Sequence, residues 1–231
     1  YTGREEAEAE LAEFRDALDA ADADFEGEFV TAASPSVVTA THVDDHYGDY
    51  EEYLFAVADA MAEEYEIVAD AGFTLQIDAP ELLTVGHTAA YADEPLEEVQ
   101  GATRLHVQAL NEALSGIPAE RVRLHTCWGS YEGPHHLDTD LADMLPAIYD
   151  ADISGLSVEQ ANPRHQHEYR AFAEHPVPDG WTLIPGVVDV KTNVIDHPET
   201  IADRLERVAD AVADGTPLAA APDCGFGTQA G

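Results

Sequence analysis

Short β-like runs alternate with long amphipathic helical segments along this chain of 231 residues. Six runs combine apolar and β-branched residues with turn residues at their ends, at 27–36, 72–82, 121–129, 153–161, 181–190 and 217–225. The helical segments between them include 50–70, 95–115 and 197–214. Alternation on this scale predicts a parallel sheet whose strands are joined by helices, either as a barrel or as a doubly wound sheet.

The barrel is favoured over the doubly wound sheet, because no strand is followed by a G-x-G-x-x-G or phosphate-binding loop. A full TIM-type barrel has eight strands, two more than the six runs. Since the chain begins with Tyr1 and not with Met, we expect a (β/α)8 barrel that lacks its first strand–helix units. No internal repeat or low-complexity linker divides the sequence, so residues 1–231 are predicted to form one partial barrel domain.

Acidic residues outnumber basic ones by 47 to 10, which gives a formal net charge of −37. They stand among alanines at helical spacing, as in REEAEAELAEFRDALDAADAD (4–24), a pattern typical of a solvated helix face. This field repels nucleic acid and anionic lipid, and no apolar run is long enough to span a membrane. We therefore expect no nucleic-acid or membrane partner, and interpret the charge as an adaptation to a high-salt cytoplasm. The hydrophobic content of 45% argues against disorder.

Side chains with metal-binding chemistry stand where the predicted strands end. Asp78 ends the second run, His125 and Cys127 the third, Glu159 the fourth and Cys224 the last. The carboxyl ends of barrel strands meet at one face, and residues two apart on a strand share a side. One imidazole, two thiolates and a carboxylate from separate strands suit a catalytic zinc site. From residue types alone, a hydrogen-bonded core histidine, buried cysteines or a disulfide stay open.

Five segments resemble the cobalamin-independent methionine synthase superfamily in order and in strand-end position: LQIDAPEL, RLHTCWGSYEGPHH, LSVEQANPRHQHEY, LIPGVVDVKTNVIDHPE and PDCGFGT. The likeness covers roughly residues 27–231 and is strongest to the short, single-barrel methionine synthase II branch, which also contains epoxyalkane:coenzyme M transferase. The resemblance implies a Zn²⁺ cofactor held by His125, Cys127, Glu159 and Cys224. It also implies an enzyme that activates a small thiol as its thiolate for attack on a methyl or alkyl donor.

The resemblance adds candidates for substrate binding. Asp78 holds the family's position for the amino group of homocysteine, and its alternative role is to cap the next helix. Ser34 is a candidate for binding a carboxylate, Trp128 for walling the pocket and Asn162 for contacting substrate from the NPRHQHEY loop. For Trp128 the alternative is plain packing. His197 is the candidate catalytic acid, with a surface role as its alternative.

Two positions depart from the family pattern. Lys191 in VDVKTN replaces the histidine acid of methionine synthases, and Gly227 stands where PDCG is normally followed by a lysine near the folate. Both changes weaken the case for a methyltetrahydrofolate donor. The polar loop 129–140 carries His135 and His136, which we expect to be exposed at the mouth of the site or to bind metal only adventitiously.

The leading functional prediction is zinc-dependent methyl transfer to homocysteine, giving methionine. One alternative is zinc-dependent alkyl transfer to another small thiol such as coenzyme M. A second is a zinc-binding barrel without turnover. A third is a metal-free barrel resembling uroporphyrinogen decarboxylase, which the set of four metal-binding residues disfavours.

Overall fold

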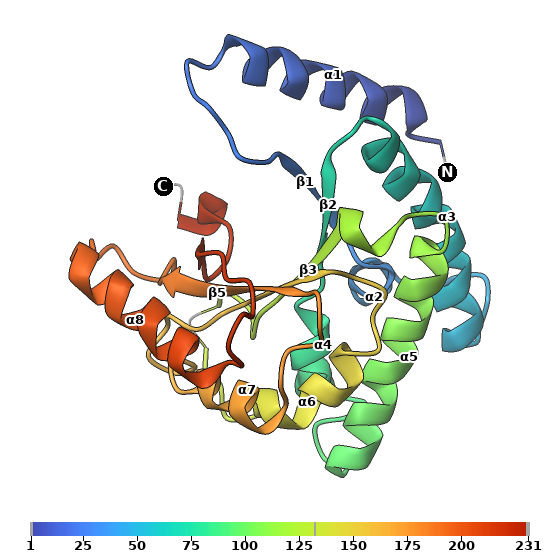
Figure 1. The fold of residues 1–231 in the computed structure, drawn as a ribbon. Helices are drawn as coiled ribbons and strands as arrows, with labels where there is room; N and C mark the ends of the chain where they lie inside the picture. Colours follow the sequence, from blue (N-terminus) through green and yellow to red (C-terminus); the bar gives the residue numbers. More distant parts are fainter. Residues whose placement is uncertain (1, 132, 230–231) are drawn as a thin grey trace.

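The computed structural model describes residues 2–131 and 133–229, and its centre is one sheet of six parallel strands (Figure 1). The strands are β1 Phe29–Ala33, β2 Thr74–Asp78, β3 Val122–Thr126, β4 Gly155–Val158, β5 Thr182–Val188 and β6 Ala221–Pro222. Each strand falls inside one of the six predicted runs and is shorter than that run. The turn and loop residues at the ends of the runs account for the difference.

Consecutive strands are neighbours in the sheet, in the order β1-β2-β3-β4-β5-β6. A doubly wound sheet would reverse its strand order at a switch point, whereas a barrel adds each strand beside the last. The sheet curls and the helices lie in an arc outside it (Figure 1). The prediction of a TIM-type barrel architecture is therefore confirmed, with six strands in a curled half-barrel.

The four long helices of the described residues match the predicted segments 4–24, 50–70, 95–115 and 197–214, and four short helices add to them. The long ones are α1 Arg4–Ala20, α3 Tyr50–Asp70, α5 Leu96–Leu114 and α8 Pro198–Ala211, and the short ones are α2 Pro35–Thr41, α4 Glu81–Thr84, α6 Leu141–Ile148 and α7 Ala171–Glu174. Single 3-10 turns are η1 Val85–His87, η2 Ala119–Arg121, η3 Glu168–Arg170 and η4 Phe226–Gln229. Asp49 caps α3 by accepting the N–H of Glu52, which explains why this helix begins where the sequence predicts.

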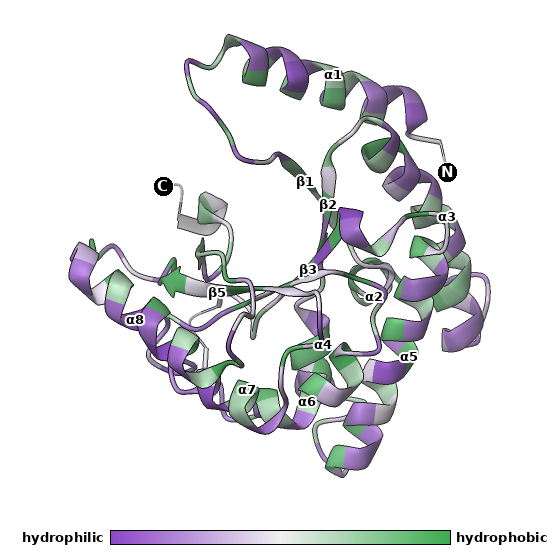
Figure 2. Ribbon diagram, in the orientation of Figure 1, coloured by the Kyte–Doolittle hydropathy of each residue, from purple (hydrophilic) through white to green (hydrophobic). Residues whose placement is uncertain are grey.

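The alternation of side chains along the strands divides the sheet into two faces. Leu75, Ile77, Leu124, Leu156 and Leu183 are fully buried, and their register places them in rows across neighbouring strands. They form the core with the helices, whose apolar sides face inward (Figure 2). The residues between them face the concave side of the sheet. The polar strand residues of this concave face are the ones that build the site described below.

Helix α1 carries much of the acidic surface. Leu11 is the one buried residue of Arg4–Ala20. The helix contacts α3 through an ion pair between Arg4 and Glu63 at 2.9 Å. Arg15 adds a hydrogen bond to the carbonyl of Ala71 at 2.8 Å. No helix in the described part of the chain has the length and apolar character required to cross a bilayer.

We expect salt to stabilise this protein, because a net charge of −37 repels itself in the folded state and dissolved ions screen that repulsion. Raising NaCl from roughly 0.1 M to 2 M should raise the unfolding temperature by several degrees or more. Thermal unfolding followed by circular dichroism in a series of NaCl concentrations measures this. An unfolding temperature that stays constant or falls along the series would remove the high-salt interpretation.

Candidate metal centre

The centre is built on the register of the middle strands. Asp78 of β2 pairs with His125 of β3, and His125 pairs with Ser157 of β4. Because Ile77 and Leu124 fill the core on the helix side, their neighbours Asp78 and His125 point to the concave face. A carboxylate, an imidazole and a hydroxyl therefore lie in one row at the carboxyl ends of the strands.

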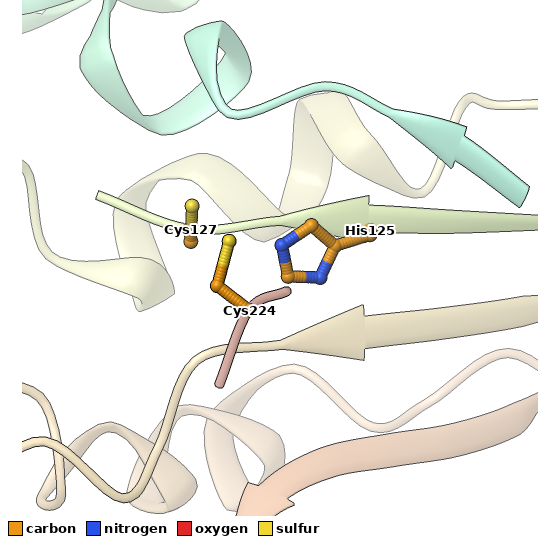
Figure 3. A group of neighbouring side chains, drawn as sticks. All are labelled: His125, Cys127 and Cys224. Atoms are coloured by element: carbon orange, nitrogen blue, oxygen red, sulfur yellow. The ribbon is translucent and has the colours of Figure 1, made fainter. Parts of the chain in front are cut away.

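Both cysteines join this row from the loops that follow strands. Cys127 comes directly after β3, and Cys224 follows β6 closely. Their sulfur atoms and a ring nitrogen of His125 all lie within 4.8 Å of one another. Figure 3 shows the three side chains grouped together. Cys127 is buried, Cys224 is partly buried, and both are free thiols, so they do not form the disulfide that the sequence left open.

The three groups share protons in a way that favours a thiolate. The nearby Cys127 thiol lowers the pKa of Cys224, and the nearby His125 ring acts in the same direction. The nearby Cys224 raises the pKa of Cys127, and burial raises it further. Burial lowers the pKa of His125, but the proximity of Cys224 and the charge of Asp78 outweigh it, so the net direction is upward.

These residues fit a divalent transition cation. Nε2 of His125 is buried without a hydrogen-bond partner, while Nδ1 lies 3.3 Å from the hydroxyl of Ser157. A buried unpartnered imidazole nitrogen beside two sulfur atoms is the donor set that zinc binds most readily. Three protein ligands leave a coordination position for a substrate atom, as catalytic zinc sites do.

Glu159, the fourth predicted ligand, lies apart from this group. Its side chain is fully buried, with Oε1 accepting from Nζ of Lys191 at 2.6 Å and Oε2 accepting from the backbone N–H of Trp128 at 3.2 Å. Lys191 is the only lysine of the sequence, and its side chain is 5% exposed. Lys191, which departs from the family pattern, thus makes a buried ion pair with Glu159, a residue predicted to bind the metal.

Asp223 fixes Cys224 relative to the loop after β4. Its fully buried carboxylate accepts backbone N–H groups of Gln160, Ala161 and Asn162 at 2.7 to 2.9 Å. Burial raises the pKa of Asp223 to about 6. The carboxylate packs directly on Gly186 of β5, where even a Cβ atom would meet it. This joint links the ends of β4, β5 and β6 around the cysteine.

A cavity of about 340 Å³ opens beside the cluster on the concave face. Asp78, His125 and Cys224 line it together with Arg123 and Ser157. The Asp78 side chain is half exposed, its Oδ1 lies 3.8 Å from Nε2 of His125, and burial raises its pKa. Sequence reasoning missed Arg123, although its spacing of two residues from His125 on β3 places it on the same face.

Ser34 lies outside this cavity lining and already binds a carboxylate of the chain itself. Its Oγ donates to Oε1 of Glu81 at 2.6 Å and accepts from the N–H of Val37, capping α2. Glu81 is buried, and burial raises its pKa to about 7. The carboxylate that Ser34 binds in the structure is therefore that of Glu81 in the same chain.

Trp128 and Asn162 have structural roles that differ from the predicted contacts with substrate. Trp128 is fully buried, stacks on His165 at 3.7 Å between ring centroids and donates Nε1–H to the carbonyl of Thr139. A ring without exposed surface has no face to offer a substrate, so the packing alternative holds. Asn162 is 5% exposed. Its amide nitrogen donates to the carboxylate of Asp189 and its amide oxygen accepts from Arg164, so both ends of the amide are hydrogen-bonded within the protein.

The structure also places the predicted histidines. His197 is exposed and caps α8, with Nδ1 accepting the N–H of Glu199 at 3.2 Å, which agrees with the surface role given as its alternative. His135 was expected to be exposed, but its side chain is 4% exposed because it turns inward onto Asp138. Its neighbour His136 is exposed as predicted.

The protein is a parallel half-barrel with a candidate metal site at the carboxyl ends of its strands, the face where barrel enzymes carry their active sites. Residues 30–231 match the family model for the catalytic domain of cobalamin-independent synthase. This chain is a member of that family, which confirms the resemblance stated from the strand-end motifs.

The similar proteins include enzymes with two different reactions. The chain is 24% identical over 145 residues to 2-hydroxypropyl-CoM lyase of Xanthobacter autotrophicus, covering 52% of this chain and 38% of that protein. It is 24% identical over 206 residues to methionine synthase of Saccharolobus islandicus, covering 85% and 51%. It is 25% identical over 182 residues to 5-methyltetrahydropteroyltriglutamate–homocysteine methyltransferase of Catharanthus roseus, covering 77% and 21%. The chain thus spans from about a fifth to about half of these relatives.

Solved structures show the same fold. A B12-independent methionine synthase from Shewanella sp. W3-18-1, in complex with selenomethionine, superposes with a TM-score of 0.68 at 21% identity, covering 98% of this chain and 60% of that one. A putative vitamin-B12-independent methionine synthase from Listeria monocytogenes gives 0.61 at 23% identity, covering 86% and 57%. Both support the barrel architecture.

Proposed function

We propose that this chain carries the zinc site of an enzyme that transfers a methyl group to the thiol of homocysteine, giving methionine. The observation that carries the proposal is the cluster of His125, Cys127 and Cys224 beside a cavity lined by Asp78. When bound by these residues, zinc would keep the substrate thiol in its thiolate form near neutral pH.

The chain's own groups prepare the site for that chemistry. His125 is oriented by Ser157 and by the carboxylate of Asp78, and the two cysteines supply negative charge next to the cation. Asp223 holds the loop that delivers Cys224. Glu159 adds a buried negative charge, which the ion pair with Lys191 balances within the protein. In this proposal Glu159 would be available as a further ligand if its ion pair with Lys191 opened.

The cavity offers opposite charges for the two ends of an amino acid. Asp78 suits an ammonium group, and Arg123 suits a carboxylate because its guanidinium presents a planar fork of donors. Arg123 is held by Nε donating to Gln76 at 2.7 Å and by stacking at 3.6 Å on the ring of Phe29. A zwitterionic thiol such as homocysteine fits this pair of charges better than a thiol of single charge.

Asp78→Asn should weaken the binding of homocysteine about tenfold, because the ammonium group loses a partner that is half exposed and therefore partly screened. A simple alkyl thiol should bind the variant and the parent protein alike. Arg123→Gln is the matched control, since it should weaken any anionic thiol and leave the alkyl thiol unchanged. Isothermal titration with each thiol measures the effects. Equal binding of homocysteine by Asp78→Asn and parent would refute the amino-group role.

A second candidate function is alkyl transfer to another small thiol, such as coenzyme M. Two observations favour it: Lys191 replaces the histidine expected in methionine synthases, and the chain is similar to 2-hydroxypropyl-CoM lyase. Arg123 suits the sulfonate of such a thiol, whereas Asp78 would have no ammonium group to bind. Comparing the affinities of the two thiols therefore separates the two reactions.

A further inference from the structure

A second cluster of metal-binding side chains lies away from the sulfur atoms, in the loops 129–140 and 159–170 and at η1. Three histidines converge on the carboxylate of Asp138. Nε2 of His87 lies 2.8 Å from Oδ1, while Nδ1 of His135 and Nε2 of His165 lie 2.8 and 2.9 Å from Oδ2. The ligand atoms of His135, Asp138 and His165 are all within 4.8 Å of one another.

The cluster is buried and its rings are held in place. The side chains of Asp138, His135 and His165 are 10%, 4% and 5% exposed, and that of His87 is 17% exposed. His165 stacks on Trp128, and His135 stacks on Tyr131 with ring centroids 4.3 Å apart. Fixed rings with nitrogen atoms aimed at one point are a prepared binding site and not a flexible surface group.

The nitrogen atoms of this cluster differ in their hydrogen bonding. His135 has Nδ1 2.8 Å from Oδ2 of Asp138 and Nε2 3.2 Å from the carbonyl of Tyr131. Both nitrogens of His165 and Nε2 of His87 are buried without a hydrogen bond of acceptable geometry. A neutral imidazole keeps a lone pair on one nitrogen, so His165 has a buried acceptor without a donor, which a cation would satisfy.

A divalent cation held by His135, Asp138 and His165 would give the unpartnered nitrogen of His165 a partner and balance the charge of the buried carboxylate. With metal bonds of about 2.0–2.2 Å, the ligand atoms of a tetrahedral zinc site lie about 3.3–3.6 Å apart, so the separations of 2.8 and 2.9 Å at Asp138 would widen by about half an ångström when a cation binds. A cavity of about 270 Å³, lined in part by His135, Asp138 and His165, gives a path from solvent.

We propose that His135, His165 and Asp138 form a second metal site, which binds a divalent first-row transition cation with zinc as the expected occupant, while His87 lies beside it on the other oxygen of Asp138. Two imidazoles and a carboxylate favour zinc over magnesium or calcium. The site ties loop 129–140 to loop 159–170 behind Trp128, whose neighbour in the chain is Cys127. It thereby supports the sulfur cluster without contacting the cavity lined by Asp78.

The test separates this site from the sulfur cluster by removing both cysteines. Tag-free Cys127→Ser/Cys224→Ser protein should still bind about one zinc per chain. Its zinc-edge X-ray absorption should show nitrogen and oxygen neighbours with imidazole scattering and no sulfur. Zinc should also raise its unfolding temperature, and a large excess of magnesium should not displace the zinc. A double-cysteine variant that binds no zinc would overturn the proposal, whatever the sulfur cluster does in the parent protein.

Substitutions within the cluster then locate the bound ion. Added to the double-cysteine protein, Asp138→Asn or His165→Gln should weaken zinc binding by about a hundredfold or more, because each removes one ligand. Asp138→Asn keeps the size of the side chain and so tests binding with the least risk to folding. His136→Gln is the matched control, since this adjacent histidine is exposed and should keep full affinity. Unchanged affinity in Asp138→Asn, or equal loss in His136→Gln, would overturn the assignment.

Discussion

Replacing Cys224 by serine is expected to remove the zinc bound at the sulfur cluster and the thiol-alkylating activity with it. A zinc site with four ligands binds with about 10–16 kcal/mol, so one thiolate contributes roughly 3 kcal/mol and its loss weakens binding more than a hundredfold. The effect should be large here because Cys224 is the cysteine that the neighbouring groups hold as a thiolate. Chelator competition, read together with sulfur scattering at the zinc edge, measures the sulfur-bound zinc.

Ser130→Ala is the matched control for this change. Its hydroxyl lies near the Cys224 thiol and helps to lower the pKa of that thiol, but it is not a ligand, so its removal should cost tenfold or less in zinc affinity. Cys127→Ser should behave like Cys224→Ser. Full sulfur-bound zinc in Cys224→Ser, with a normal unfolding temperature, would show that the metal lies elsewhere.

Gly186→Ala should be the most destabilising single-methyl change in the sheet. The new Cβ would lie 2.8 Å from Cα of Asp223 and 3.1 Å from its Cγ, so backbone and not only a side chain would have to move. Overpacking of this kind costs about 3 kcal/mol, which lowers the unfolding temperature of a chain of this size by roughly 6–12 °C. Because Asp223 carries Cys224, the variant should also lose zinc affinity.

Gly101→Ala supplies the comparison. Gly101 lies exposed in α5, and a Cβ there meets nothing within 4 Å. Alanine should therefore stabilise the helix by up to about 1 kcal/mol. Differential scanning calorimetry of both variants measures the contrast. Equal unfolding temperatures for the two would mean that the close packing of Asp223 on Gly186 does not exist in solution.

The strand runs and the strand-end positions could be predicted from the sequence because both are local. A run such as 72–82 has its turn residues at its ends, and the spacing of His125 and Cys127 fixes their common side. Asp78 was found in the same way, and the structure pairs it with His125. The common side of His125 and Cys127 therefore needed no knowledge of tertiary contacts, whereas the family resemblance was what placed Cys224 beside them.

The other site residues depend on contacts between distant segments. Whether Glu159 faces the sulfur atoms or Lys191 depends on how the loop after β5 packs, which no spacing within the sequence states. The partners of Asn162 and Ser34 within the protein could not be read from the sequence for a similar reason, since Asp189 and Glu81 come from distant segments. The burial of His135 arises because Asp138 and His165 come together from two loops.

The central claim is that the sulfur cluster binds zinc and that the substrate thiol joins its ligands. Zinc-edge X-ray absorption of the zinc-loaded protein, before and after addition of homocysteine, tests this most directly. Asp138→Asn protein should be used, so that the spectrum reports the sulfur cluster alone. We predict two sulfur neighbours per zinc without the thiol and three with it. A spectrum without sulfur neighbours, or one that homocysteine leaves unchanged, would contradict the account.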